Sequence, residues 1–155
     1  MRTQKPYKER DDLERIQSQW SKLSGLLHRG EWSAAIVRAA TAAEIAANFA
    51  IRKEFESKSE FNSGFINSLL LWANGLVGKI DRLLIHLSEG EKHHKRIKKL
   101  KRFSEQINKK RNAIVHQGEF CDEEEAKAAI QQSRQFIETL VNIYELAFTL
   151  KDKKR

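Results

Sequence analysis

The scarcity of chain-breaking residues is the feature that most restricts the fold of this sequence. Its 155 residues include only seven glycines and one proline. A β-sandwich or barrel needs turn-forming residues at intervals of about eight to twelve positions, and this chain offers too few of them. Apolar residues recur instead three and four positions apart, which is the period of an α-helix with one buried face. The sequence therefore predicts an all-α fold without a sheet.

The apolar periodicity predicts four or five helices, with Gly30 and Gly90 between neighbouring ones. Gly75 and Gly78 lie inside the third and are candidates to break or bend it. No linker or internal repeat divides the chain, so we expect one antiparallel bundle of four to five helices, a single domain over residues 1–155. Residues 1–10 and 151–155 are basic and polar and are expected to form short tails. The expected helices cover approximately residues 12–28, 33–55, 63–87, 92–116 and 122–150.

The charge of the chain is strongly positive. Lysine and arginine number 29 against 21 acidic residues, which gives a net charge of +8. A positive field attracts phosphates, of nucleic acid or of an anionic membrane surface, although a solvated basic surface is an equally simple explanation. The only cysteine, Cys121, excludes an internal disulfide and fits a reducing compartment. No stretch of about 18 unbroken apolar residues is present. We therefore expect a cytoplasmic protein without a membrane partner.

Two of the expected helices have unusual faces. The second has a stripe rich in alanine, whose small side chains let a neighbouring helix approach closely, and Glu44 lies on this stripe. On the fifth, Phe136, Ile143 and Leu150 recur every seven residues beside the main core face. This flank is either buried on a second side within the bundle or is the contact surface of a dimer.

Chemistry is concentrated in the segment from Lys109 to Gly118, which reads KKRNAIVHQG. On a helix, Asn112 and His116 are four positions apart and share a face. Arg111 is in register with apolar residues on the stripe that faces the core. A buried guanidinium is costly unless it is paired, so Arg111 either reaches solvent, is paired, or has a function. Glu44 is the candidate partner, and the alternative is that both residues lie exposed at the rim.

The same segment resembles the signature of the HEPN superfamily. Arg111 and Asn112 are followed by three residues and His116 near the end of a helix, and then by Gly118 and another long helix. The family pattern is an arginine, a polar residue, a few further positions and a histidine, on a bundle of four or five helices. The resemblance covers most of the chain in helix order. At the residue level it covers this motif and, weakly, the alanine-rich helix that contains Glu44.

The resemblance implies a metal-independent endoribonuclease. The ribose 2′-hydroxyl would attack the adjacent phosphate and leave a 2′,3′-cyclic phosphate and a free hydroxyl end. His116 would transfer protons, Arg111 would hold the phosphate with its planar fork, and Asn112 would orient the phosphate or the imidazole. Acid and base are both needed and each chain offers one motif histidine, so a homodimer with a composite active site is expected. No cofactor or metal is expected.

A toxin or antiviral-defence effector would fit this activity, with an antitoxin or regulatory protein as a possible partner. In related proteins a nucleotidyltransferase partner modifies a tyrosine two residues after the motif histidine. Gly118 occupies that position here, which puts this mode of neutralisation in doubt.

A dense basic run from Lys92 to Arg102 opens the helix that carries the motif, and it either tracks an RNA backbone or is a solvated helix face. Trp20, Trp32 and Trp72 are expected in the core rather than as surfaces for base stacking. His93 and His94 diverge by ~100° on a helix, and no cluster has metal-ligand spacing, so no metal site is expected. The candidate RNA-binding residues are Lys98, Lys99, Lys101, Arg102, Lys109 and Lys110.

The motif also has a purely structural interpretation. A histidine in the last turn of a helix is favoured by the helix dipole, and a glycine after it is a common C-cap. The competing functional class is a non-catalytic HEPN module that binds RNA, a nucleotide or a protein partner. RNA cleavage in EDTA by wild type and by His116→Ala distinguishes the two classes.

Overall fold

The structure, a computed structural model, describes residues 5–153 of the chain. Helices make up the regular structure in these residues, and no strand occurs among them, as the sequence predicted. The third expected helix is divided, so the helical segments number six where five at most were expected. In chain order the elements are a short 3₁₀ turn, η1 (Tyr7–Glu9), then α1 (Asp12–His28), α2 (Trp32–Lys58), α3 (Ser63–Trp72), the continuous trio α4 (Leu76–Gly78), η2 (Lys79–Leu84) and α5 (Ile85–Leu87), α6 (His94–Gln117) and α7 (Glu123–Asn142).

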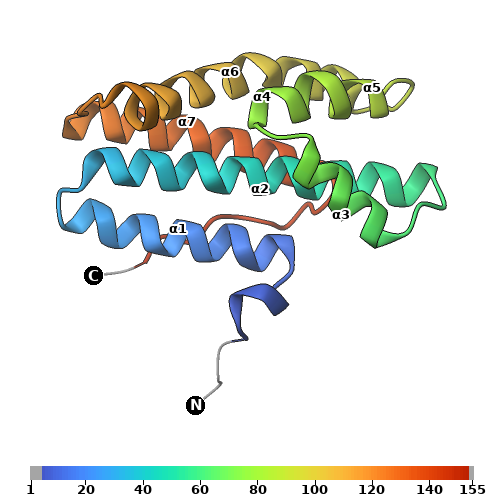
Figure 1. Cartoon of the computed structure of the whole chain (residues 1–155), viewed down its shortest axis with the longest axis horizontal. Coiled ribbons are helices and arrows are strands. Elements are labelled where there is room, and N and C mark those ends of the chain that lie inside the picture. The colour runs from blue at the N-terminus through green and yellow to red at the C-terminus, as the bar shows by residue number, and fades with distance from the viewer. Residues whose placement is uncertain (1–4, 154–155) are drawn as a thin grey trace.

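Helix α2 is the centre of the molecule (Figure 1). It packs against α1 on one side and against α6 and α7 on the other. Its alanines explain this position, because side chains of one carbon let helices approach from several directions. Seven of them are fully or almost fully buried: Ala35, Ala39, Ala42, Ala43, Ala46, Ala47 and Ala50.

By length and composition α2 is also apolar enough to cross a membrane, the one such helix among the described residues. Within the structure, however, 61% of its most apolar window is buried by the rest of the chain. The central helix of a water-soluble bundle meets the same length and composition test, because it too must be apolar around most of its circumference.

The third expected helix is interrupted at Gly75. Helix α3 ends at Trp72, and Gly75 takes φ 90° and ψ 144°, a left-handed conformation that a residue with a Cβ rarely adopts. Gly78, the other candidate, stays within the right-handed helical region. The chain then continues through η2, which is wound as a π-helix, and this short turn carries Lys79 into the interior.

Helix α6 ends at Gly118, which adopts the left-handed conformation with φ 67° and donates its backbone N–H to the carbonyl of Ala113. Helix α7 begins with Asp122 as N-cap, whose side chain accepts from the backbone N–H of Glu125 at 2.8 Å. The sequence predicted a helix start at about residue 122 and a glycine cap after the motif histidine, and both are present. They fix the connection between the motif helix and α7.

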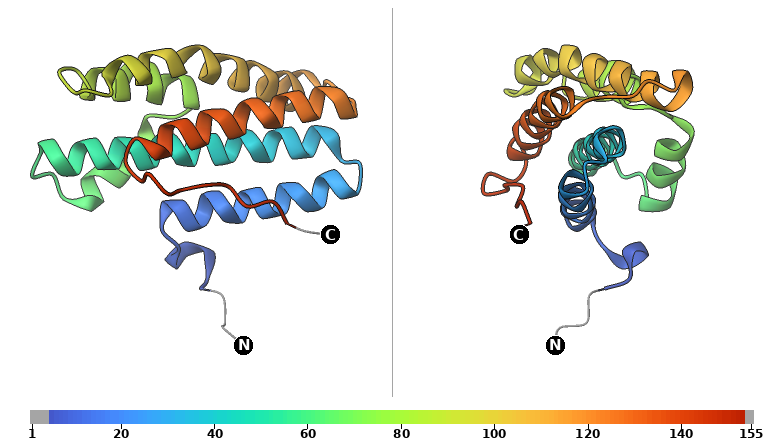
Figure 2. Two further views of the ribbon diagram at one scale, coloured as in Figure 1. Left: turned by 180° about the vertical axis from the view of Figure 1, so that it is seen from behind. Right: turned by 90° about the vertical axis from the view of Figure 1, so that its left-hand side faces the viewer.

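The end of α7 differs from the expectation. The helix stops at Asn142 rather than near Leu150, and residues 143–153 turn and run back along α1 (Figure 2). Side chains of α7 itself replace some of the lost helical hydrogen bonds. Leu150 donates its N–H to Glu138 and accepts from Arg134 at its carbonyl, both at 3.1 Å.

The second apolar flank predicted for the fifth helix is therefore not a free surface. Phe136 is fully buried, Leu150 is 5% exposed, and Ile143 packs against the core. Of the two alternatives for this flank, the structure shows burial within the fold, because the chain covers these residues itself when it folds back. Large exposed apolar side chains lie elsewhere, notably Leu71 and Trp72 on α3, each 83% exposed.

The described parts of the two expected tails are more ordered than their composition suggested. Residues Tyr7–Glu9 form a helical turn, and the guanidinium of Arg10 donates to the Ser18 hydroxyl and the Lys5 carbonyl. Lys151 exchanges two hydrogen bonds of 2.9 Å with the side chain of Gln17. The remaining parts of the expected tails, residues 1–4 and 154–155, lie outside the described residues.

Candidate active site

The motif lies on the last two turns of α6, where the sequence predicted it. Arg111 is partly buried, and its Nη1 donates to Asn112 Oδ1 at 3.1 Å. Both residues line a cavity of about 350 Å³ between α6, α2 and the break between α3 and α4. Most of its lining side chains are polar. Its residues are Ala40, Thr41, Glu44, Asn74, Gly75, Leu76, Ile107, Asn108, Arg111 and Asn112.

His116 is exposed on the last turn of α6 and does not line this cavity. It lies four residues after Asn112 and therefore on the same side of the helix. Within the described part of the chain its side chain has no hydrogen-bond partner. The imidazole is thus accessible to a ligand, with Asn112 one turn away and Arg111 bonded to Asn112.

The predicted ion pair between Glu44 and Arg111 does not form among residues 5–153. Glu44 Oε1 instead accepts from Lys79 Nζ at 2.9 Å, with the Lys79 side chain only 5% exposed. The prediction failed because Lys79, which lies on the π-helical turn and on no apolar stripe of the sequence, pairs with Glu44 instead. Glu44 and Arg111 nevertheless line the same cavity. The guanidinium makes no ion pair within the described residues, and its charge remains available for an anion.

The predicted RNA-binding residues divide into two groups. Lys101 Nζ lies 3.0 Å from Asp81, and Lys110 Nζ lies 3.0 Å from Glu119 and 3.6 Å from Glu125. In each case the hydrogen bond to the acidic partner raises the pKa of the lysine. The four others are exposed and make no ion pair with described residues: Lys98, Lys99, Arg102 and Lys109.

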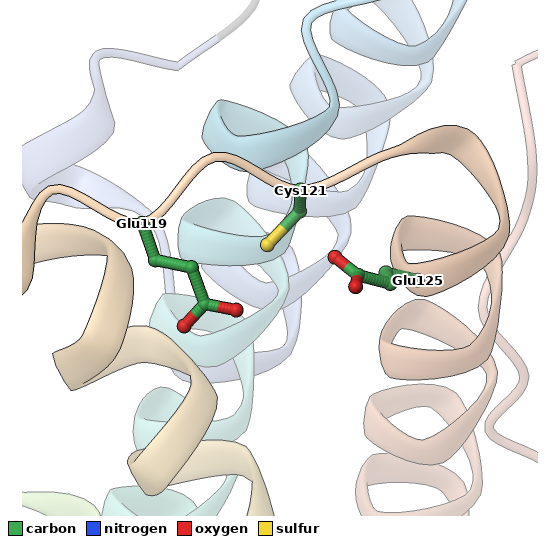
Figure 3. A group of neighbouring side chains, drawn as sticks. All are labelled: Glu119, Cys121 and Glu125. Carbon is green, nitrogen blue, oxygen red and sulfur yellow. The ribbon is translucent and has the colours of Figure 1, made fainter.

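The loop after the motif gathers a cysteine and two carboxylates, a group that spacing in the sequence did not reveal. Glu119, Cys121 and Glu125 place their ligand atoms within 4.8 Å of one another, and Figure 3 shows them converging from the loop and the first turn of α7. Burial raises the pKa of the Cys121 thiol, which favours its protonated form. The ammonium of Lys110 already contacts both glutamates. Its charge offsets part of the negative charge of the group and holds α6 to α7.

A second polar group, also missed from the sequence, lies at the opposite end of α6. Glu54 of α2 is 2% exposed and accepts from the Tyr144 hydroxyl at 2.6 Å. Lys58 Nζ lies 2.9 Å from its other oxygen, and His93 Nε2 lies 2.5 Å from Oε1. The group ties α2, the start of α6 and the segment after α7 together. It therefore fixes the orientation of the helix that carries the motif.

This group is expected to make stability fall at both extremes of pH. Burial alone would raise the pKa of Glu54, but hydrogen bonds from Tyr144, Lys58 and His93 bring it below its ordinary value. The stability that Glu54 contributes is therefore fully present above the unfolded pKa of about 4.3. It is lost as the pH falls through the pKa of Glu54 in the folded protein. Burial and the bond to Glu54 raise the pKa of Tyr144 far above the ordinary range. The stability that Tyr144 contributes is fully present below about pH 10, its unfolded pKa, and is lost as the pH rises further.

Urea denaturation between about pH 3 and pH 11, with Tyr144→Phe as the comparison, checks this expectation. The variant should be less stable at neutral pH, because Glu54 loses a donor, yet should lose less stability than wild type above about pH 10. Lys58 is common to both proteins, so its titration does not account for the difference. An identical alkaline loss in both proteins would contradict the role of Tyr144.

Comparison of the chain with models of protein families, with curated proteins and with solved structures found no match.

Proposed function

We propose that this protein is a HEPN-like, metal-independent endoribonuclease whose active site is built around Arg111, Asn112 and His116. The observation that supports it most is the state of Arg111. Its guanidinium lies in a polar cavity, without a carboxylate partner among the described residues, and donates to Asn112, which lies one turn before an exposed histidine. A planar cation placed in this way suits a phosphate, and a neighbouring imidazole suits proton transfer.

In the proposed reaction the 2′-oxygen forms a bond to phosphorus and the bond to the 5′-oxygen of the next nucleotide breaks. The proton of the 2′-hydroxyl passes to a base, and an acid delivers a proton to the leaving oxygen. His116 takes one of these two roles. Arg111 stabilises the charge that develops on the phosphate oxygens, and Asn112 holds the guanidinium through the 3.1 Å hydrogen bond.

A second copy of the chain would supply the other proton-transfer group, so the active species is proposed to be a homodimer. Because the chain itself covers the apolar flank of Phe136, Ile143 and Leu150, helix α3 is the more suitable surface for this dimer contact. Leu71 and Trp72 are each 83% exposed, and Phe65 is 49% exposed. Asn74, two residues after Trp72, lines the cavity that contains Arg111. A two-fold contact through α3 would therefore lie next to both cavities.

A non-catalytic module that binds RNA, a nucleotide or a protein is the second candidate, and one observation favours it. His116 lies outside the cavity that holds Arg111 and Asn112. In this alternative the cavity binds an anion and the histidine only ends the helix. A cytoplasmic role as a toxin or antiviral effector, restrained by an antitoxin or regulator, belongs to the first proposal.

The test is to incubate purified protein with labelled single-stranded RNA in EDTA and to identify the product ends. We expect fragments that carry 2′,3′-cyclic phosphates and 5′-hydroxyls, and an oligonucleotide with 2′-O-methyl groups throughout should stay intact. Cleavage that EDTA abolishes, or products with 5′-phosphates, would contradict the proposed chemistry. Tight binding of RNA without any cleavage would support the second candidate.

A further inference from the structure

We propose that the groove between α1 and the segment after α7 binds the phosphodiester backbone of single-stranded RNA. The groove has a volume of about 1350 Å³ and lies between η1, the outer face of α1 and residues 147–153. Figures 1 and 2 show α1 and α6 on opposite sides of α2. This surface is therefore separate from the motif and from the basic run on α6.

The charge of the groove is almost entirely of one sign. Seven cationic side chains line it, against a single carboxylate, Glu14, which already pairs with Lys5 at 3.3 Å. Arg29 has its own partner, Glu31. The five other cations make no ion pair with any residue the structure describes: Arg10, Lys22, Arg38, Lys151 and Lys153. Like charges gathered without counter-ions repel each other, and a polyanion in the groove would relieve that repulsion.

Two of these cations are held in place by neutral partners. The guanidinium of Arg10 donates to Ser18 Oγ at 2.8 Å and to the Lys5 carbonyl at 2.9 Å. Arg38 Nη1 donates to Gln19 Oε1 at 2.9 Å. Hydrogen bonds to neutral acceptors orient a guanidinium without cancelling its charge. The remaining donors are thus preorganised for phosphate oxygens.

Tyr7, which also lines the groove, has three cations around its aromatic ring. The Arg10 guanidinium and the Lys22 ammonium each lie 5.8 Å from the ring centroid, and the Arg15 guanidinium lies 5.5 Å from it. The Tyr7 hydroxyl accepts from Gln19, which fixes the ring on α1. The ring holds these cations close together by cation–π attraction, where no carboxylate does so.

The shape of the groove favours a flexible strand over a membrane surface. Arg10 and Arg38 are only partly exposed, and they line a concave surface that a flat bilayer would not enter. A positively charged groove that follows the backbone, with aromatic side chains on which bases stack, is the usual design for single-strand binding. Tyr7 and Phe148 line this groove. The choice of RNA over DNA rests on the proposed function. The inference that the groove binds a single strand rests on its charge and shape and does not depend on that function.

The experiment measures the affinity for a fluorescent, single-stranded 2′-O-methyl RNA of about 16 nucleotides by anisotropy at several salt concentrations. The test variant is Lys22→Gln/Arg38→Gln/Lys151→Gln, and its matched control is Lys53→Gln/Arg82→Gln/Lys127→Gln, which removes the same charge outside the groove and α6. We expect at least a tenfold loss of affinity in the test variant. The slope of log K against log salt should fall by about 2, since each phosphate contact contributes about 0.7.

Three results would overturn the proposal. They are equal losses in the two variants, unchanged RNA binding by the test variant, or a loss of binding to phosphatidylserine vesicles by the test variant with RNA binding retained. Unchanged thermal unfolding confirms that both variants are folded. The oligonucleotide resists 2′-hydroxyl chemistry, so this binding result is independent of whether the protein cleaves RNA. Failure of the ribonuclease proposal would appear only in the cleavage assay.

Discussion

His116→Ala is expected to lower the rate of RNA cleavage by about 10²–10⁴-fold and to leave the melting temperature unchanged. The first part follows from proton transfer, because removal of a positioned acid or base typically costs that factor. The second follows from the geometry. The side chain is exposed on the last turn of α6 and makes no hydrogen bond with the described residues, so the fold does not depend on it. Initial rates on labelled RNA and a thermal unfolding curve measure the two effects.

His28→Ala is the matched control. His28 is also an exposed histidine in the last turn of a helix, α1, and it contributes no group to the motif. Its substitution should leave the cleavage rate within about twofold of wild type, because surface substitutions away from a site are near neutral. Equal rates in wild type and His116→Ala would eliminate the proposed role of the motif histidine.

Mixtures of wild-type and His116→Ala chains extend the same experiment to the proposed dimer. If two motifs form one site, a mixed dimer should lose far more than half of the wild-type activity. Activity in proportion to the number of wild-type chains, or a monomer in sedimentation at the assay concentration, would contradict a composite site.

Trp20→Ala is expected to destabilise the fold by about 3–5 kcal/mol. The side chain is fully buried in the core. Its Nε1 donates to Asp152 Oδ1 at 3.0 Å, and the Arg134 guanidinium lies 5.1 Å from its ring. The substitution therefore leaves a cavity and removes the contact that holds the segment after α7 against α1. The free energy of unfolding in urea measures the change.

Trp72→Ala is the matched control for the same residue type. Trp72 is 83% exposed on α3, so its removal should change the stability of the monomer by about 0.5 kcal/mol or less. A comparable loss in both variants would contradict the difference in burial between Trp20 and Trp72. A loss for Trp72→Ala that appears only at high protein concentration would instead indicate that α3 is covered in a dimer.

The bounds of the helices were predictable where the apolar periodicity ends beside a capping residue. Helix α1 has the expected bounds, and Asp122 and Gly118 mark the ends beside the α6–α7 connection as expected. The end of α7 was not predictable, because no glycine or proline stands between Asn142 and Leu150. There the tertiary contacts of Arg134 and Glu138 with Leu150 outweigh local helix propensity.

The place of the candidate site residues on their helix was predictable, but the pairing of their charges was not. A helical register places Arg111, Asn112 and His116 correctly along α6. The register does not predict which side chain from another element contacts Glu44. In the structure this side chain is Lys79, which comes from a π-helical turn. Trp72 shows a similar limit, because an apolar residue in an apolar helix was expected in the core, yet it faces outward. Periodicity predicts that a helix has an apolar face but not whether another element covers it.

The contact between α1 and the segment after α7 affects how the chain is made. Gln17 and Lys151 bond to each other across 134 positions, and Trp20 and Asp152 across 132. A ribosome adds about 5–20 residues per second, so α1 waits on the order of ten seconds for these partners. During translation Trp20 lacks the acceptor for its indole N–H and part of its cover. A nascent chain stalled before residue 150 would present this apolar surface to chaperones, which would then bind it more tightly than the finished protein.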